Sequence, residues 1–119
     1  MKLSEHFDSN EFACKCGCGY QNNGRDIDPR LVEILEHIRH YVGDVPLIIS
    51  SGLRCPIHNA NEGGTPKSYH LQGKAADISC PKGLTPIELK IAARKAGADG
   101  IGLYAWGIHI DTRGYDAEW

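Results

Sequence analysis

Two histidines and an aspartate have the side-chain types and spacing of a catalytic zinc site. His70 and Asp77 lie in the segment 68–77, and His109 follows in the strand-like stretch 107–111. Imidazole nitrogens and a carboxylate oxygen suit Zn²⁺, and three protein ligands leave a fourth position open. Such an ion lowers the pKa of a bound water to about 7 and polarises a neighbouring carbonyl. Taken singly, each residue would be better explained by a structural role.

Two helices are predicted, one before His70 and one between Asp77 and His109. Asp28 as N-cap and Pro29 at the first helical position precede an apolar stripe at helical spacing, so we predict a helix that Gly43 ends. The capping box at 85–88, which contains a proline at the first helical position, predicts a second helix ending near Gly97.

Strand signals account for most of the remaining chain. The apolar run 45–50 predicts a buried strand, and a long loop is expected from there to about Tyr69. Residues 74–78 form a short segment that is expected to be extended. The stretches 100–104 and 107–113 read as the two strands of a hairpin.

Alternation in the last strand separates a polar face from an apolar face. His109 and Asp111 share one side, opposite Ile108 and Ile110. Because strands and helices do not alternate regularly, we predict an α+β fold in which a small antiparallel sheet is flanked by helices. Residues 1–119 are expected to form one domain, with the Cys-rich segment 1–24 packed on it as loop and a short helical turn at 9–12.

The charge balance excludes several partner classes. Thirteen Lys and Arg against fifteen Asp and Glu give a net charge of -2 without a basic stripe, so no nucleic-acid partner is expected. No apolar stretch is long enough to insert into a membrane, and the polar start has no signal-peptide core. We therefore expect synthesis in the cytoplasm, with delivery elsewhere depending on another factor. The oligomeric state is left open.

Further short motifs surround the candidate ligands. They are Ser51-Gly52-Leu53-Arg54, His58-Asn59, Gly63-Gly64, Ser68-x-His70-x-x-Gly73-x-Ala75-x-Asp77 and His109-x-Asp111. Together they resemble the zinc D-alanyl-D-alanine carboxypeptidase family over roughly residues 1 to 113. The Cys-Gly run 12–19 is similar to that of small phage and prophage members. The resemblance implies a hedgehog/DD-peptidase-like fold and a zinc metallopeptidase that cuts peptide bonds in bacterial peptidoglycan.

The resemblance also implies roles for individual residues. His70, Asp77 and His109 would bind one Zn²⁺ ion. Arg54 would contact the carbonyl that develops negative charge, where one well-placed donor contributes about 3 to 4 kcal/mol. As an isolated residue, Arg54 would instead be read as a surface arginine at a strand exit.

Two further positions are candidates for contact with substrate. They are Ser68, which could also bind a ligand carboxylate, and His58. Ordinary turn chemistry is the alternative for Ser68, and loop stabilisation is the alternative for His58.

The general base has no clear match. Relatives place a glutamate three residues, or a histidine five residues, before the last ligand, and here these positions hold Trp106 and Tyr104. Tyr104 could donate a proton to an oxyanion or leaving group. Asp111 is the nearest carboxylate to His109 in the sequence. It is a candidate catalytic base, with orientation of the ligand histidine as the alternative.

Five cysteines complete the inventory of reactive side chains. The alternate spacing at 14, 16 and 18 is not that of a zinc ribbon, and disulfides, reduced thiols and a second metal site all stay open. We expect one of these three to join the N-terminal segment to Cys55, next to Arg54. The fifth is Cys80.

The function that these observations favour is hydrolysis of peptidoglycan stem peptides, by carboxypeptidase or endopeptidase cleavage. One alternative is a zinc-containing cell-wall or protein-binding module without catalysis, because the usual base is missing. The other is a structural domain that holds no metal.

Overall fold

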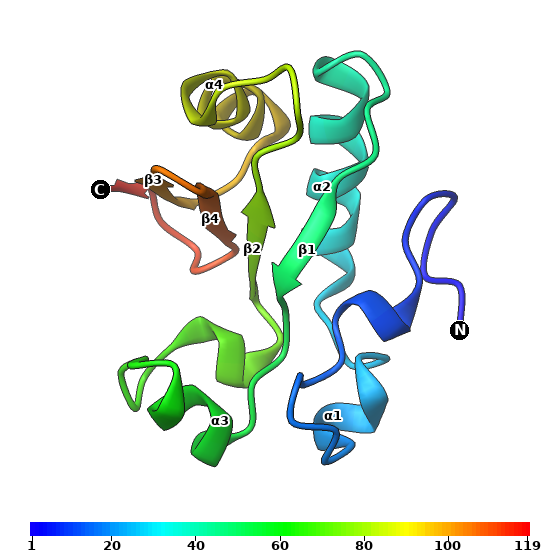
Figure 1. Ribbon diagram of the computed structural model, residues 1–119, viewed down its shortest axis with the longest axis vertical. Helices are drawn as coiled ribbons and strands as arrows, with labels where there is room; N and C mark the ends of the chain where they lie inside the picture. Colours follow the sequence, from blue (N-terminus) through cyan, green and yellow to red (C-terminus); the bar gives the residue numbers. More distant parts are fainter.

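A five-stranded sheet forms the centre of the fold in the computed structural model, which describes residues 1–119. Its strands follow the order β1-β2-β4-β3-β5, antiparallel except for the parallel pair β3 and β5 (Figure 1). The predicted α+β class with an antiparallel sheet is therefore confirmed. The strands are β1 (Ile48–Ser51), β2 (Ala75–Ser79), β3 (Gly100–Tyr104), β4 (Gly107–Asp111) and β5 (Ala117–Glu118).

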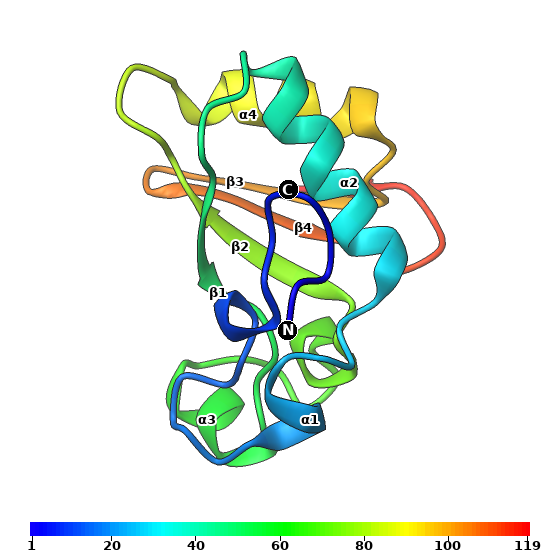
Figure 2. The same cartoon turned by 90° about the vertical axis from the view of Figure 1, so that its right-hand side faces the viewer.

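Two helices cover one face of this sheet, and both begin where the sequence predicts. Helix α2 (Pro29–Tyr41) is capped by Asp28, and α4 (Pro86–Ala96) begins at a reciprocal capping box between Thr85 and Glu88. Figure 2 shows α4 across the top of the view and α2 slanting down from it in front of the strands, and residues of both helices belong to the same buried core. The helices thus leave the opposite face of the sheet free for other side chains.

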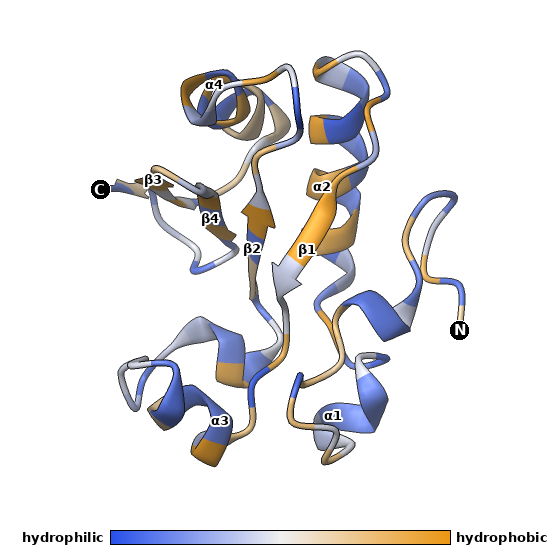
Figure 3. Cartoon of the chain, viewed as in Figure 1, coloured by the Kyte–Doolittle hydropathy of each residue, from blue (hydrophilic) through white to orange (hydrophobic).

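The core lies between the helices and the sheet. Alternate residues of the central strands are fully buried there: Ala76 and Ile78 on β2, Ile108 and Ile110 on β4, and Ile101 on β3. In Figure 3 the side of α2 that faces β1 is largely hydrophobic. Each buried isoleucine contributes about 1.5 to 3 kcal/mol. Because strand side chains alternate, the residues between these apolar positions point away from the helices.

The strand predicted at 45–50 is shifted and less buried than expected. β1 begins at Ile48, which is 67% exposed, and only Ile49 is buried. The prediction of a buried strand is wrong for most of β1, because β1 is an edge strand and Ile48 lies on the face of the sheet opposite the core residue Ile49.

Four short elements were not predicted, namely α1 (Tyr20–Asn23), α3, η2 (Tyr69–Gln72) and β5. Helix α3 (Pro56–Asn61) lies inside the expected loop, with proline at its first position and Cys55 as N-cap. Six residues are too few for a helical hydrophobic period to be recognised. The two-residue strand β5 is shorter still, and its pairing with β3 depends on the fold.

The N-terminal segment packs against the main body. Its predicted helical turn is present as η1 (Ser9–Glu11), and Phe7 and Phe12 belong to the same buried cluster as α2. The single turn α1 (Tyr20–Asn23) follows the Cys-rich loop. None of the helices has the length and apolar character needed to cross a membrane.

Candidate metal centre

The three predicted ligands meet on the face of the sheet that the helices leave free. Asp77 on β2 and His109 on β4 are direct partners in the antiparallel register, and His109 Nδ1 lies 3.0 Å from Asp77 Oδ1. His70 lies in the short helix η2 (Tyr69–Gln72), and its Nε2 is 3.2 Å from the same oxygen. The three potential ligand atoms all lie within 4.8 Å of one another.

Each histidine is oriented by the ring nitrogen that points away from this cluster. His70 Nδ1 donates to the carbonyl of Gly52 at 2.7 Å, and His109 Nε2 donates to Asp111 Oδ2 at 2.8 Å. Since a carbonyl and a carboxylate only accept, the other nitrogen of each neutral ring presents a lone pair to Asp77. Three acceptors therefore converge on one point, an arrangement that a cation stabilises.

In the absence of a metal, imidazole N–H groups that donate to Asp77 take the place of the cation. Burial alone would raise the pKa of Asp77, but hydrogen bonds from His109 and His70 hold it well below its usual value. Burial lowers the pKa of His109, yet its contacts with Asp111 and Asp77 produce a net increase. A cation that binds here meets an ionised carboxylate and displaces the proton by which His109 contacts Asp77.

Asp111 lies behind His109 and does not line the cleft. Its side chain is fully buried and accepts from the Gly100 amide at 3.1 Å and from Arg113 at 2.9 and 2.7 Å. A side chain at position 100 would collide with this carboxylate, so glycine is needed there. The expectation that Asp111 acts as catalytic base is corrected, since a group in this position orients a ligand histidine and cannot reach substrate.

Replacing Asp111 with asparagine should therefore weaken metal binding. Asparagine is nearly isosteric but removes the charge that holds His109, and loss of such a partner lowers metal affinity by about 10- to 100-fold. Competition with a chromophoric chelator measures the change. Unaltered metal affinity combined with abolished cleavage would return Asp111 to the catalytic role.

A cleft of about 470 Å³ opens above the three ligands, and Arg54 forms part of its wall. The Arg54 side chain donates to Ser51 Oγ at 2.9 Å, to Asn59 Oδ1 at 3.5 Å and to Asp77 Oδ2 at 3.1 Å. Asp77 thus faces both imidazoles with one oxygen and the guanidinium with the other. The structure brings Arg54 to the ligands, as its position in the motif led us to expect.

Aromatic side chains form another part of the wall. Tyr104 stacks on Trp106 with ring centroids 5.0 Å apart, and its phenol oxygen accepts from Trp119 Nε1 at 2.7 Å. The phenol proton therefore remains free for a bound molecule. Trp119 also lies 5.3 Å from the ring of His109, in space that a side chain at Gly102 would fill.

The two predicted substrate-contacting residues differ in position. Ser68 lines the cleft, and its Oγ accepts from the His70 amide at 3.2 Å. His58 does not line it, which corrects that expectation: its Nε2 lies 3.6 Å from Glu62, and Glu62 is the residue that faces the cleft.

Several residues that line the cleft were not predicted from the sequence. Glu62 lies one helical turn after His58, and Arg113 continues the alternate spacing of the strand that holds His109. Both residues could therefore have been identified from their spacing. No such spacing marks Tyr69 or Trp119. The guanidinium of Arg113 lies over the rings of both, 5.0 Å from the centroid of Tyr69 and 4.8 Å from that of Trp119.

Three of the matches with known proteins bear on this site. The sequence model of the family described as Peptidase M15 matches residues 5–111. A zinc D-Ala-D-Ala carboxypeptidase from Streptomyces albus G is 41% identical over 44 residues, which are 37% of this chain and only 17% of that protein. The crystal structure of an L-Ala D-Glu endopeptidase from Serratia marcescens superposes with a TM-score of 0.55 at 23% identity, covering 79% of this chain and 86% of that one.

Proposed function

The chain belongs to the peptidase M15 family, and from this premise we propose that it is a zinc-dependent hydrolase of peptide bonds in peptidoglycan stem peptides. The observation that carries the proposal is the convergence of two imidazoles and a carboxylate at the floor of an open cleft, beside an arginine. The names of the two relatives, which act as a D-Ala-D-Ala carboxypeptidase and an L-Ala D-Glu endopeptidase, support the substrate class.

The donor set fits zinc. His70, Asp77 and His109 would hold the ion through two nitrogens and one oxygen, and three protein ligands are typical of catalytic rather than structural sites. When bound, zinc supplies a Lewis acid that polarises the scissile carbonyl and acidifies water.

Arg54 is held ready to bind negative charge on the carbonyl oxygen of the substrate. Three of the five guanidinium N–H groups are directed at Ser51, Asn59 and Asp77, which leaves two for the substrate. Because these contacts hold the side chain in place, little reorganisation is needed when charge develops.

Proton transfer requires a base that the cleft exposes to substrate, and we assign this role to Glu62. Among the lining residues the carboxylates are Asp77 and Glu62, and Asp77 is committed to the histidines and Arg54. The side chain of Glu62 is 52% exposed, and its charged neighbour is His58, whose Nε2 lies 3.6 Å from Glu62 Oε1. Tyr104, with its phenol proton available, would donate to the leaving group or oxyanion.

Glu62→Gln should lower kcat while zinc content stays unchanged. Removal of a general base costs about 10²- to 10⁴-fold in rate. The measurement is initial rate against substrate concentration, together with metal analysis. Glu33→Gln, an exposed position on α2, serves as the matched control and should behave as wild type. A Glu62→Gln protein with wild-type kcat would remove Glu62 from the mechanism.

The charges of the cleft suit a peptide that carries carboxylates. Lys67 and Arg113 line it together with Arg54, against the two acidic residues already named. Stem peptides present carboxylates along and at the end of the chain, so the cationic side chains can bind them while the aromatic wall covers the peptide.

Digestion of purified peptidoglycan fragments, followed by mass analysis, tests the function and the bond together. Release of free alanine identifies D-Ala-D-Ala cleavage, and release of a peptide that begins with D-Glu identifies L-Ala-D-Glu cleavage. A zinc-loaded protein that releases no fragment from several wall chemotypes, yet is retained on peptidoglycan, would refute hydrolysis and establish a binding module instead.

A further inference from the structure

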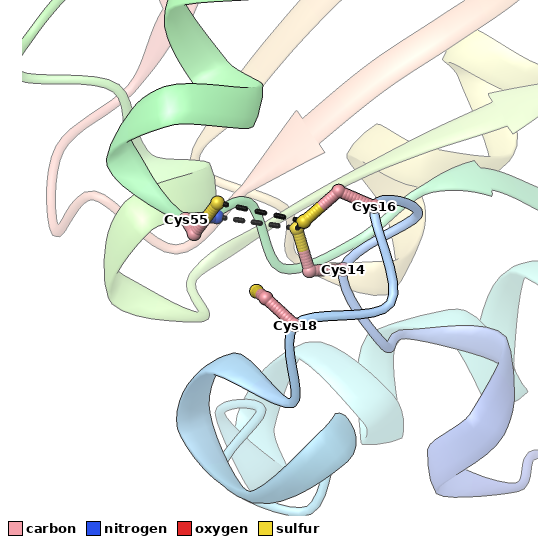
Figure 4. A group of neighbouring side chains, drawn as sticks. All are labelled: Cys14, Cys16, Cys18 and Cys55. Carbon is pink, nitrogen blue, oxygen red and sulfur yellow. Dashed lines mark hydrogen bonds between the residues drawn. The ribbon is translucent and has the colours of Figure 1, made fainter.

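A second group of possible metal ligands lies outside the cleft. Three cysteines of the loop between η1 and α1, Cys14, Cys16 and Cys18, approach Cys55 (Figure 4). Cys55 is the N-cap of α3. Cys14 Sγ lies 3.4 Å from Cys16 Sγ, which in turn lies 3.7 Å from Cys55 Sγ. All four sulfur atoms lie within 4.8 Å of one another.

These separations match a metal–thiolate cage. Four sulfur atoms placed tetrahedrally around zinc at about 2.3 Å are about 3.8 Å apart, whereas the sulfur atoms of a disulfide are about 2.05 Å apart. The four side chains are free thiols here. Each sulfur atom is near the other three. Two disulfide bonds would not require all four sulfur atoms to gather around one point.

Backbone amides support two of the sulfur atoms. The Cys55 amide donates to Cys14 Sγ at 3.4 Å, and the His58 amide donates to Cys55 Sγ at 3.4 Å. Such N–H groups orient thiolates and stabilise their charge, as outer contacts commonly do for metal ligands. Cys14 and Cys55 are buried while Cys16 and Cys18 are exposed, so an ion can enter from solvent.

We propose that Cys14, Cys16, Cys18 and Cys55 bind a second zinc ion with a structural role. Four protein thiolates close the coordination shell and leave no position for substrate, unlike the site at His70, Asp77 and His109. The cysteine site is therefore separate from the proposed peptidase function and stands whether or not the chain cleaves peptidoglycan.

The site would fix the wall of the cleft. Cys55 directly follows Arg54 and caps α3, and α3 carries Asn59, which contacts the Arg54 guanidinium. A metal bound by Cys55 would tie the N-terminal loop to this helix and thereby hold Arg54 beside Asp77. Removal of the metal would loosen Arg54 while leaving the three zinc ligands of the cleft in place.

Metal analysis of protein purified without added zinc tests the proposal. Wild type should contain about two equivalents, and His70→Ala and Cys18→Ser about one each. Cys80→Ser is the matched control, because Cys80 Sγ donates to the Leu84 carbonyl at 3.1 Å and belongs to neither site. Cys80→Ser should keep both equivalents. A wild type with one equivalent that Cys18→Ser retains would overturn the proposal.

Spectroscopy on His70→Ala, in which all the cysteines are intact, gives a second readout that does not depend on a cysteine variant folding. X-ray absorption at the zinc edge of His70→Ala should show only sulfur neighbours, at about 2.3 Å. Cobalt loaded into the same protein should give intense thiolate charge-transfer bands. Nitrogen and oxygen neighbours alone, or fewer than five alkylated cysteines in unreduced protein after chelation, would overturn the proposal in favour of an empty site or a disulfide.

The two proposals fail in different ways. Absence of any sulfur-bound zinc from a protein that cleaves peptidoglycan contradicts the cysteine site alone. Retention of that zinc in a protein that cleaves nothing contradicts the peptidase function alone.

Discussion

His70→Ala is expected to abolish peptidoglycan cleavage and to remove about one equivalent of zinc. His70 is 3% exposed, and its ring is fixed by the Gly52 carbonyl so that Nε2 points at Asp77. Two ligands cannot hold zinc in a catalytic geometry. Because the ion contributes several kcal/mol of transition-state stabilisation, the rate should fall by at least about 10³-fold. Elemental analysis and the fragment assay measure the two effects on the same sample.

His40→Ala provides the matched control for this prediction. His40 carries the same ring on helix α2, where it is exposed and its nearest acidic partner is Asp44 at 3.8 Å. Its replacement should alter neither zinc content nor cleavage. If His70→Ala kept its full zinc content and activity, the three-ligand site would be wrong.

Arg54→Ala is expected to lower kcat/KM by about 10²- to 10³-fold while zinc stays bound, since loss of one oxyanion donor has this effect. The side chain lines the cleft and is held by Ser51 and Asp77, so its donors sit beside the metal ligands. Steady-state kinetics with parallel metal analysis separates the loss of a donor from the loss of zinc.

Arg54→Lys refines the test, and Arg25→Ala controls it. Lysine keeps the positive charge but cannot direct separate N–H groups at Ser51, Asn59 and the substrate, so only a small part of the activity should return. Arg25 is exposed and lies outside the cleft, and its replacement should be neutral. Full activity in Arg54→Lys would mean that charge alone, and not the planar geometry, matters at this position.

The part of the site that could be predicted from sequence depends on local periodicity. His109 and Asp111 alternate with two isoleucines, so the polar face of β4 was predictable, and Asp77 ends a motif that runs into β2. The helices α2 and α4 carry caps that mark their first residues. These signals are local in the chain and act over a few residues, which makes them readable without the fold.

The remaining parts depend on contacts between distant segments. That Asp111 faces His109 Nε2 rather than the cleft follows from the burial of β4 between β2 and β3. Trp119 reaches the site because β5 pairs with β3. The sequence suggested that one of the three N-terminal cysteines joins Cys55, whereas only the fold shows that all three approach it.

The register between β2 and β4 determines both which residues enter the core and which residues meet at the metal site. Asp77 pairs with His109 on one face of the sheet. The next pair, Ile78 and Ile108, lies on the opposite face, in the core. A slip by one residue would turn the isoleucines of one strand toward water and push its ligand into the helices. Any such misaligned sheet would lose its hydrophobic burial before it could present a wrong ligand set. The packing beneath the sheet thus selects the register that brings Asp77 beside His109, although the isoleucines themselves bind no metal.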